Sequence, residues 1–268
     1  MPAGAGRMTP ADTMQSVIYS GLTYAEIPGF RPLLLDLHVP DDAADVPVVV
    51  WIHGGGYISG DRRYLPPTLV PGSIFAALTG AGLACASVDY RLAAEAAWPA
   101  QREDIAAAIG FVRSAAGEYG LDATRLGTWG ESAGGHLALM AGLTEPGIAG
   151  VVAWYPLTDL ALLPPSAFSG SEQTRLLGRR AAEDPDLIAG ASPITHVSGA
   201  SPPCLLVHGD RDEALPALHS ERFHQALTAA GGESACQIVP GAGHCFTGYD
   251  DVPGLVASSV AYLAAKLR

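Results

Sequence analysis

Short runs of apolar residues recur along the chain, and most of them are followed by a longer stretch with helical spacing. Continuous apolar runs are typical of strands that are buried on both faces of a parallel sheet. Such strands are expected over residues 33–39, 47–52, 83–88, 125–129, 148–155, 204–208 and 235–239. A further run at 22–27 precedes a Pro28-Gly29 turn, which predicts an antiparallel hairpin with the strand at 33–39.

Helices are expected between these strands, over residues 66–79, 99–119, 133–143, 216–230 and 252–267. In the second of them, Ile105, Ala108, Ile109 and Val112 follow helical spacing, and Gly120 suits its end. Strands that alternate with helices predict an α/β protein, with a mostly parallel central sheet of about eight strands and helices on both faces. The sequence has no internal repeat and no second core, so residues 1–268 are expected to form a single domain.

Two segments fall outside this alternation. Residues 1–20 begin with small and polar side chains and are expected to form a loose N-terminal segment. Residues 160–199 hold several prolines, a basic patch of Arg175, Arg179 and Arg180, and no strong period. We interpret this second stretch as a partly helical excursion over the surface, and as a candidate lid or pocket wall.

Composition removes some classes of function. The 268 residues carry a net charge of -12. This argues against nucleic-acid binding, because that function needs clustered Lys and Arg to neutralise phosphates. Hydrophobic residues make up 49%, which is ample material for a packed core. The basic residues are nearly all Arg, and together with abundant Ala, Gly and Pro they point to a GC-rich bacterial genome.

The sequence also predicts a cellular location. Residues 1–20 hold no apolar stretch long enough for a signal peptide, and no window reaches the roughly 18 unbroken apolar residues of a membrane span. We therefore expect a cytoplasmic protein with no membrane partner. The four cysteines form no C-x-x-C pair, so neither a metal nor a redox site is expected. Cys204 and Cys236 each open a predicted strand and would lie near each other if those strands are neighbours, although we expect reduced thiols.

The stretch Gly130-Glu131-Ser132-Ala133-Gly134 lies between an expected strand and an expected helix. A serine on such a sharp turn projects its hydroxyl above the sheet, and the flanking glycines relieve the crowding. A serine hydroxyl is a poor nucleophile at neutral pH, so it needs a base within hydrogen-bond reach and a carboxylate that orients this base. Later strand ends offer candidates for both.

His244 is the candidate base, because it lies in a glycine-flanked loop after the last expected strand. His136 is a rival, but it follows Ser132 by only four residues on the same helix, and we expect it to be packed in the interior. The candidate acid is Asp210 or Asp212, which both follow the strand at 204–208, and their spacing barely separates them. In a parallel sheet these positions all lie beyond the carboxyl ends of the strands, where ligands bind.

A triple glycine, Gly54-Gly55-Gly56, follows the strand at 47–52. Acyl transfer passes through a tetrahedral oxyanion, which is stabilised by fixed N–H donors. The N–H groups of Gly55 and Gly56, with that of Ala133 after the serine, are the expected oxyanion hole. A phosphate-binding loop is the alternative, but the chain has neither G-K-S/T nor G-x-G-x-x-G at a helix start.

Motifs along most of the chain resemble those of the α/β-hydrolase fold, and more narrowly the esterases related to hormone-sensitive lipase and the BD-FAE-like bacterial carboxylesterases. The motifs are HGGGY at 53–57, SGD at 59–61, DYRL at 89–92, GESAGGHLA at 130–138, ASPITHV at 191–197, PPCLLVHGDRD at 202–212 and PGAGHCF at 240–246. The resemblance covers residues 33–267, approximately the whole of the expected fold.

The resemblance implies roles for individual residues. In these esterases the catalytic Asp stands in a pattern like H-G-x-x-D, which selects Asp212 and leaves Asp210 as a turn residue. It carries the oxyanion role onto Gly55 and Gly56. It also implies hydrolysis of short-chain carboxylic esters, a small-molecule substrate, and no metal or organic cofactor. The chain reaches its first strand early, so we expect no large cap domain over the site.

Several alternatives remain open from sequence. An amidase, formamidase or peptidase would use the same residues. A non-catalytic ligand-binding protein with a hydrolase fold is a third alternative. Asp61, Asp104 and Glu131 could be catalytic, but we expect them to form structural pairs. The exposed face of the last strand and helix could pair two subunits as a homodimer. The residues expected to line a substrate pocket are Tyr57, Trp98, Trp154, Leu160, Phe168 and Phe246.

Overall fold

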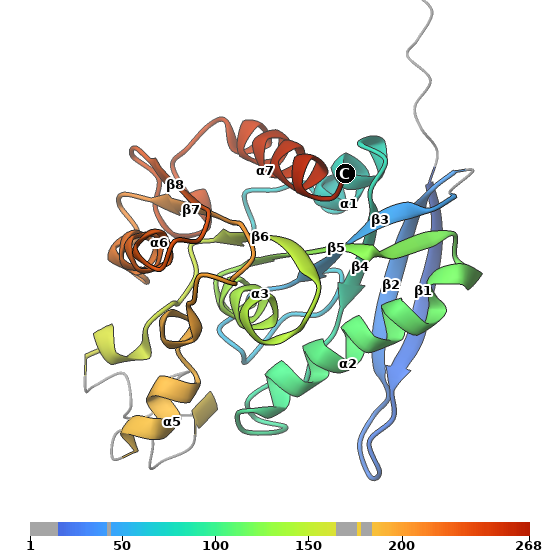
Figure 1. Cartoon of the computed structure of the whole chain (residues 1–268), viewed down its shortest axis with the longest axis horizontal. Coiled ribbons are helices and arrows are strands. Elements are labelled where there is room, and N and C mark those ends of the chain that lie inside the picture. Colours follow the sequence, from blue (N-terminus) through green and yellow to red (C-terminus); the bar gives the residue numbers. More distant parts are fainter. Residues whose placement is uncertain (1–15, 42–43, 165–175, 178–183) are drawn as a thin grey trace, which may run out of the picture.

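A computed structural model describes residues 16–41, 44–164, 176–177 and 184–268 of the chain. It is built on one eight-stranded sheet, with the strands in the order β1-β2-β4-β3-β5-β6-β7-β8 (Figure 1). The strands are β1 (Ser16–Ala25), β2 (Leu33–Pro40), β3 (Val46–Ile52), β4 (Ala84–Val88), β5 (Leu121–Glu131), β6 (Ile148–Trp154), β7 (Cys204–Gly209) and β8 (Ser234–Val239). Strands β3 to β8 are parallel, and β2 runs antiparallel to both β1 and β4. The expected mostly parallel α/β sheet is confirmed.

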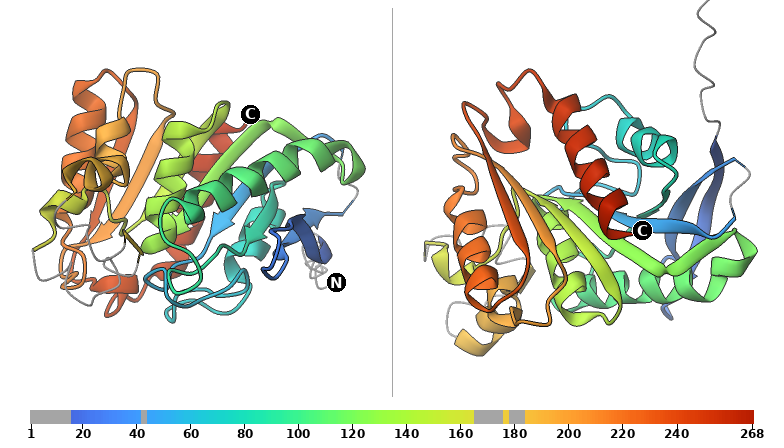
Figure 2. Two further views of the ribbon diagram at one scale, coloured as in Figure 1. Left: turned by 90° about the horizontal axis from the view of Figure 1, so that it is seen from below. Right: turned by 45° about the horizontal axis from the view of Figure 1, so that its top comes forward.

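Helices cover both faces of the sheet (Figure 2). Strand β3 shows why its sequence is apolar throughout: Val48 and Val50 belong to one buried cluster, while Val49 and Trp51 belong to the other. The first cluster includes residues of α2 (Ala100–Ala115), α3 (Ala133–Thr144) and α6 (Leu218–Ala229), and the second includes residues of α1 (Ser73–Gly80) and α7 (Val252–Lys266). Each strand face is therefore dry, which fixes the sheet between two helical layers.

Two expected boundaries are wrong. Strand β1 begins at Ser16, within the segment expected to be loose. It is an edge strand, and Val17, Ile18 and Tyr19 are exposed, so it lacks the buried apolar pattern that identified the other strands. The helix expected over 66–79 begins only at Ser73, because prolines interrupt residues 66–71 and Gly72 has the left-handed φ of 80°.

The stretch 160–199 is described in part. It contains a 3₁₀ turn at Leu160–Leu162, α5 (Pro185–Gly190) and a second 3₁₀ turn at Pro193–His196. The backbone carbonyl of Leu176 accepts a hydrogen bond from the backbone N–H of Trp98 at 2.8 Å, and Leu176 is fully buried. Phe168 and the three arginines of the basic patch lie outside the described residues.

The sequence predicted that Cys204 and Cys236 would lie near each other if their strands are neighbours. The strands that carry Cys204 and Cys236 are neighbours, as required for the two residues to approach, but Cys236 pairs with Leu206, and Cys204 pairs with Ser234. All four cysteines are free thiols.

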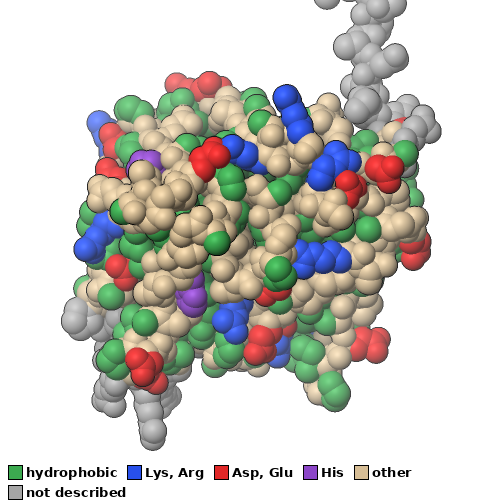
Figure 3. All heavy atoms as spheres, viewed as in Figure 1, with side chains coloured by type: hydrophobic (Ala, Val, Ile, Leu, Met, Phe, Trp, Pro, Cys, Tyr) green, Lys and Arg blue, Asp and Glu red, His purple; other side chains and the backbone are tan. Residues whose placement is uncertain are grey.

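Of the helices in the described ranges, none combines the length and apolar character that crossing a membrane requires. On the face shown in Figure 3, Lys and Arg side chains are scattered among acidic ones and form no continuous patch.

Candidate active site

Parallel strands bring four separate segments to one edge of the sheet. Ser132 directly follows β5, and the glycine loop follows β3. Asp212 follows β7 by three residues, and His244 opens a 3₁₀ turn (His244–Phe246) after β8. These positions are far apart in the sequence, but the carboxyl ends of adjacent parallel strands meet in space.

The turn at Ser132 is strained and tightly packed. Ser132 has φ 52° and ψ −117°, a conformation that side-chain-bearing residues rarely adopt. A Cβ on Gly130 would lie 2.1 Å from the backbone oxygen of Gly134, and a Cβ on Gly134 would lie 2.0 Å from the backbone oxygen of Ile52. Both glycines of the G-x-S-x-G stretch are therefore required by close backbone approaches, which hold the serine between β5 and α3.

His244 connects Ser132 to Asp212. Its Nδ1 lies 2.7 Å from Oδ2 of Asp212, and its Nε2 lies 3.1 Å from Oγ of Ser132. An ionised carboxylate can only accept, so the proton of the neutral imidazole is on Nδ1. This tautomer leaves the Nε2 lone pair directed at the serine hydroxyl, which is the arrangement that a general base requires.

Asp212 is held in its ionised form. Its side chain is fully buried, and burial alone would raise the pKa of the carboxyl. Hydrogen bonds from His208 and His244, with a backbone N–H bond from Leu215, outweigh burial and keep the pKa well below its usual range. Oδ1 accepts from the backbone N–H groups of Ala214 and Leu215, at 2.9 and 2.8 Å, so the carboxylate is fixed as well as charged.

The neighbouring carboxylate, Asp210, has a different position. It is exposed and accepts a hydrogen bond from the backbone N–H of Gly241 at 2.7 Å. This bond joins the loop after β7 to the loop after β8. Asp210 is therefore a turn residue in the geometry of the site, and Asp212 is the carboxylate that contacts His244.

His136 is part of the interior, as expected. Its Nε2 donates to the backbone oxygen of Ala191 at 2.7 Å, and its ring packs against Tyr57 and Trp98. Burial lowers the pKa of His136 to about 4, so the ring is neutral near pH 7. It forms no hydrogen bond with the Ser132 side chain among the contacts of the described residues.

The glycine loop has a backbone conformation that favours glycine. Gly55 and Gly56 have φ of 96° and 61°, and a Cβ on Gly55 would lie 2.2 Å from the backbone oxygen of Ser59. Within the described part of the chain, the N–H groups of Gly55 and Gly56 donate to no other residue. Ala133 is the first residue of α3, where the backbone N–H has no intrahelical acceptor. These three donors are free to bind a ligand.

Both ends of this loop are anchored. At its start, the Tyr90 hydroxyl donates toward the backbone oxygens of His53 and Gly54, and the two rings of Tyr90 and His53 stack at 4.3 Å. At its far end, the Arg62 guanidinium forms ion pairs with Asp36 at 2.7 Å and with Asp89 at 2.9 Å. The loop is thus fixed to β2 and to the segment after β4.

The three carboxylates expected in structural roles lie as follows. Asp61 accepts from the backbone N–H of Arg63 at 2.8 Å, and Asp104 forms an ion pair with Arg91 at 2.7 Å. Glu131 accepts from the backbone N–H of Gly54 at 2.7 Å. Each therefore has a partner, and the partner of Glu131 belongs to the glycine loop.

Two hollows adjoin Ser132. One, of about 90 Å³, is lined by Gly56, Tyr57, Ser132, Ala133, Leu157, Ala214, Leu215 and His244. The other, of about 320 Å³, is lined by Gly55, Gly56, Ile58, Ser59, Tyr64, Glu131, Ser132, Ala214, His244 and Cys245. Sequence reasoning missed the lining residues Leu157, Leu215, Ile58 and Tyr64, although the first three follow the carboxyl end of a parallel strand by a few residues.

The expected pocket residues are only partly at these hollows. Tyr57 lines the smaller one, whereas Trp98 packs against His136. Leu160, Trp154 and Phe246 are fully buried. These three line neither hollow: Trp154 and Phe246 belong to one core cluster and Leu160 to the other, because a large apolar ring or chain near a strand end also serves to close the core. Phe168 lies outside the described residues.

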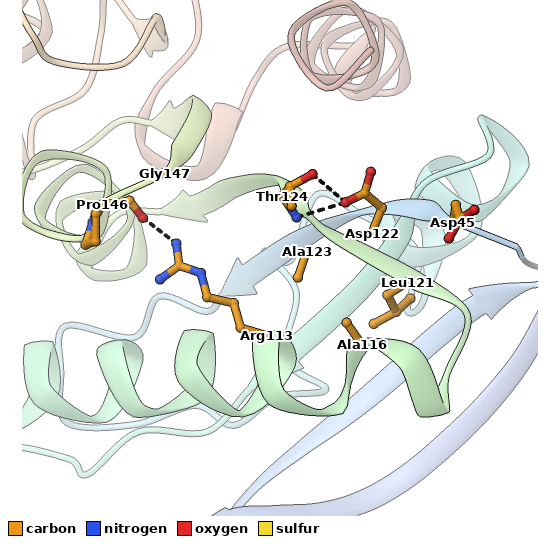
Figure 4. Close-up of a pocket in the computed structure, with 9 residues that line it drawn as sticks. All are labelled: Asp45, Arg113, Ala116, Leu121, Asp122, Ala123, Thr124, Pro146 and Gly147. Atoms are coloured by element: carbon orange, nitrogen blue, oxygen red, sulfur yellow. Dashed lines mark hydrogen bonds between the residues drawn. The ribbon is translucent and has the colours of Figure 1, made fainter.

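Another cavity, of about 660 Å³, lies at the opposite end of the sheet (Figure 4). It is formed by the start of β5, the end of α2 and the turn before β6, and its lining includes Arg113, Asp122 and Thr124. It shares no residue with the hollows beside Ser132. In the ranges that the structure describes, no group of three or more His, Cys, Asp or Glu could hold a metal ion.

Comparison with known proteins is consistent with this geometry. A family model described as BD-FAE matches residues 35–227. Esterase LipC of Mycobacterium tuberculosis is 28% identical over 82% of this chain, and Esterase LipQ of the same organism is 29% identical over 82%. The matches span 57% and 55% of those two proteins, so the chain covers little more than half of their length.

A solved structure shares the fold over nearly the whole chain. It is described as a truncated form of a carbohydrate esterase from gut microbiota, and it superposes with a TM-score of 0.84. The sequences are 26% identical, and the match covers 96% of this chain and 99% of that one. The strand order, the parallel sheet and this similarity together identify the architecture as the α/β-hydrolase fold.

Proposed function

Because this chain belongs to the BD-FAE family, we propose that it is a serine hydrolase that cleaves short-chain carboxylic esters through an acyl-enzyme on Ser132. The observation that carries the proposal is the position of His244, which bridges Asp212 at 2.7 Å and Ser132 at 3.1 Å. The relatives named as esterases support the same reaction class.

In the first half of the reaction, Oγ of Ser132 attacks the ester carbonyl carbon while Nε2 of His244 takes the hydroxyl proton. Asp212 stabilises the resulting imidazolium through Nδ1. The carbonyl oxygen becomes an oxyanion, which accepts hydrogen bonds from the N–H groups of Gly55, Gly56 and Ala133. Each such donor contributes roughly 10²–10³-fold in rate.

The tetrahedral intermediate then collapses and releases the alcohol. His244 delivers its proton to the leaving oxygen, and the acyl group remains on Ser132. A water molecule deprotonated by His244 attacks this acyl-enzyme, a second oxyanion forms at the same three donors, and the acid leaves with Oγ reprotonated. The protein's own groups supply every proton transfer in this cycle.

The two hollows beside Ser132 suggest which substrates to test. The smaller one, of about 90 Å³, has room for only a short acyl or alkoxy group, and the larger one, of about 320 Å³, has Ser59 and Tyr64 in its wall. The carbohydrate esterase of similar fold adds carbohydrate esters to the candidates. A panel of esters that varies the acyl and the alcohol part independently reports the shape of both hollows.

The direct test is Ser132→Ala with p-nitrophenyl acetate as substrate. We expect kcat to fall by about 10⁴-fold or more, because the nucleophile of a serine hydrolase has no substitute. Ser258→Ala is the matched control, since Ser258 is an exposed serine on α7, and its activity should equal that of the wild type. A Ser132→Ala protein with undiminished hydrolysis contradicts the proposal. Rates on p-nitroacetanilide in the same assay distinguish an esterase from an amidase.

A cytoplasmic location and assembly as a homodimer, both predicted from the sequence, extend this proposal but do not follow from the site. Light scattering after size exclusion measures the second directly. The proposed chemistry requires neither of them.

A further inference from the structure

Glu131 is a buried carboxylate that the proposed reaction does not use. It ends β5, directly before Ser132, and it is only 1% exposed. It takes part in none of the ion pairs found among the described residues. Burying a carboxylate without a cation is costly, so this position requires a physical reason.

The carboxylate is fitted against the start of the glycine loop. Its Oε1 accepts the backbone N–H of Gly54 at 2.7 Å. A Cβ added to Gly54 would lie 2.1 Å from Oε1, 2.5 Å from Cδ and 2.6 Å from Oε2. The glycine at this position therefore makes room for the carboxylate, and the two groups are matched in shape as well as by a hydrogen bond.

The hydrogen bond between Gly54 and Glu131 lies next to the turn of the glycine loop. Gly54 directly precedes Gly55 and Gly56, whose positive φ angles set the direction of their N–H groups. Rotation of the Gly54 peptide would change the direction of both donors, and an oxyanion donor works only at hydrogen-bond distance from the developing charge. Glu131 and Ser132 are adjacent in the chain, so the bond ties the nucleophile's own strand to the oxyanion loop.

Four titratable side chains face Glu131. The hydroxyl of Tyr155 and the thiol of Cys245 lie beside it, and His244 and Tyr64 interact with it electrostatically. Burial raises the pKa of Glu131 to about 7, and the Gly54 N–H, His244 and Tyr155 offset part of that rise. Its carbonyl-type oxygen can accept the Gly54 bond in either protonation state.

We propose that Glu131 is a positioning residue, which holds the N–H of Gly54 and so fixes the orientation of the Gly55 and Gly56 donors for the oxyanion. This inference rests on the proposed esterase reaction, because the loop has no oxyanion to stabilise without it. In the proposed reaction Glu131 neither attacks the carbonyl nor transfers a proton, and it acts through the Gly54 N–H.

The test compares Glu131→Ala with Glu131→Gln in the full chain, using p-nitrophenyl acetate. Alanine removes the acceptor, and we expect kcat to fall about 10- to 100-fold while KM changes less than about threefold, because misplaced donors weaken transition-state binding. Glutamine keeps an oxygen acceptor of the same reach, so it should restore kcat to within about threefold of wild type. A wild-type kcat in Glu131→Ala, or an equal loss in both variants, overturns the proposal.

A reciprocal test does not depend on a stable Glu131→Ala protein. Gly54→Ala drives a Cβ into the carboxylate and should lower kcat by a factor similar to that of the missing acceptor. Adding Glu131→Gln to this variant should then change kcat less than about twofold, because the contact is already broken. A wild-type kcat in Gly54→Ala contradicts the proposal.

Ser132→Ala and the wild type are measured in the same series. An inactive wild type contradicts the esterase function itself. An active wild type, an inactive Ser132→Ala and an unimpaired Glu131→Ala contradict only the role of Glu131.

Discussion

Two regions of the candidate site, the loop after β7 and the turn after β5, each bury a carboxylate, but the pKa values of the two carboxylates are shifted in opposite directions. Asp212 in the first region has a pKa well below the usual range, whereas the pKa of Glu131 in the second is raised to about 7. Burial pushes both pKa values upward. The difference must therefore come from the hydrogen-bond donors that each carboxylate receives.

Asp212 receives many donors and Glu131 few. Two backbone N–H groups and the ring N–H of His244 reach Asp212, and the His208 ring lies 3.4 Å away. Among the described residues, Glu131 accepts one backbone N–H, that of Gly54, and the Tyr155 hydroxyl lies beside it. A loop with free N–H groups can thus lower the pKa of a buried carboxylate, while the end of a strand, whose N–H groups pair with neighbouring strands, offers fewer donors to offset burial. The first arrangement suits a permanent negative charge, and the second suits a hydrogen-bond acceptor.

The largest expected effect tests the charge in the loop after β7. Asp212→Asn should lower kcat about 10³–10⁴-fold, because an amide cannot hold the His244 tautomer or stabilise the imidazolium. Asp210→Asn is the control, since Asp210 is an exposed turn residue two positions away, and it should lose less than about threefold. Steady-state kinetics on p-nitrophenyl acetate measure both. Similar losses of kcat in the two variants would contradict the assignment of Asp212 as the carboxylate that orients His244.

A smaller effect tests how tightly the turn after β5 is packed. Gly134→Ala should lower the free energy of unfolding by about 2–3 kcal/mol, because its Cβ would lie 2.0 Å from the backbone oxygen of Ile52. Gly110→Ala, at an exposed position of α2 with no atom near the new methyl, should instead stabilise by up to about 1 kcal/mol. Urea unfolding measures both changes. Equal effects would show that the turn can relax, and that Glu131 is not held by it.

The smallest effect tests the unusual pKa of Glu131. Between about pH 4.5, the ordinary value, and about pH 7, folded Glu131 binds a proton that the unfolded chain has released. The unfolding free energy contributed by this group is therefore present at low pH and falls as the pH rises through that window. Glutamine does not titrate, so Glu131→Gln should gain stability relative to wild type between pH 5 and pH 8, by on the order of 1–3 kcal/mol. A difference between the two proteins that is constant with pH would place the carboxylate in a wet or paired environment.

The central strands and the helices between them were predictable, because a strand that is dry on both faces must be apolar throughout and leaves a continuous run in the sequence. Strand β1 was misplaced for the converse reason. Its residues Val17 to Tyr19 are exposed at the sheet edge, so its place depends on backbone pairing with β2, which leaves no pattern of buried side chains. The start of α1 was missed because local prolines outweighed an apparent helical period.

Residues with a chemical signature were predictable at the site, and residues that act only through shape were not. Ser132 and His244 are recognisable because a reactive side chain among glycines at a strand end is unusual, whereas only the family resemblance selected Asp212 over Asp210. Leu157 and Leu215, which line the smaller hollow, have no such signature, because the sequence pattern does not distinguish a leucine in the core from one beside a cavity. Trp154 and Phe246, predicted for the pocket, line neither hollow and belong to the core, because a buried aromatic residue leaves the same signal in the sequence at both places.

The sequence by itself determined the parallel sheet and the segments that end at its carboxyl edge, because both follow from the periodicity of apolar residues and from local turn chemistry. Only the tertiary structure decided which buried carboxylate has a lowered pKa and which a raised one, which glycines are required and which aromatic residues belong to the core. Those properties depend on distances between segments far apart in the chain, such as Glu131 and Gly54 or Gly134 and Ile52. The physical reason is that hydrogen bonding and steric contact act over a few ångströms, whereas the sequence pattern records only each residue's preference for water or for the interior.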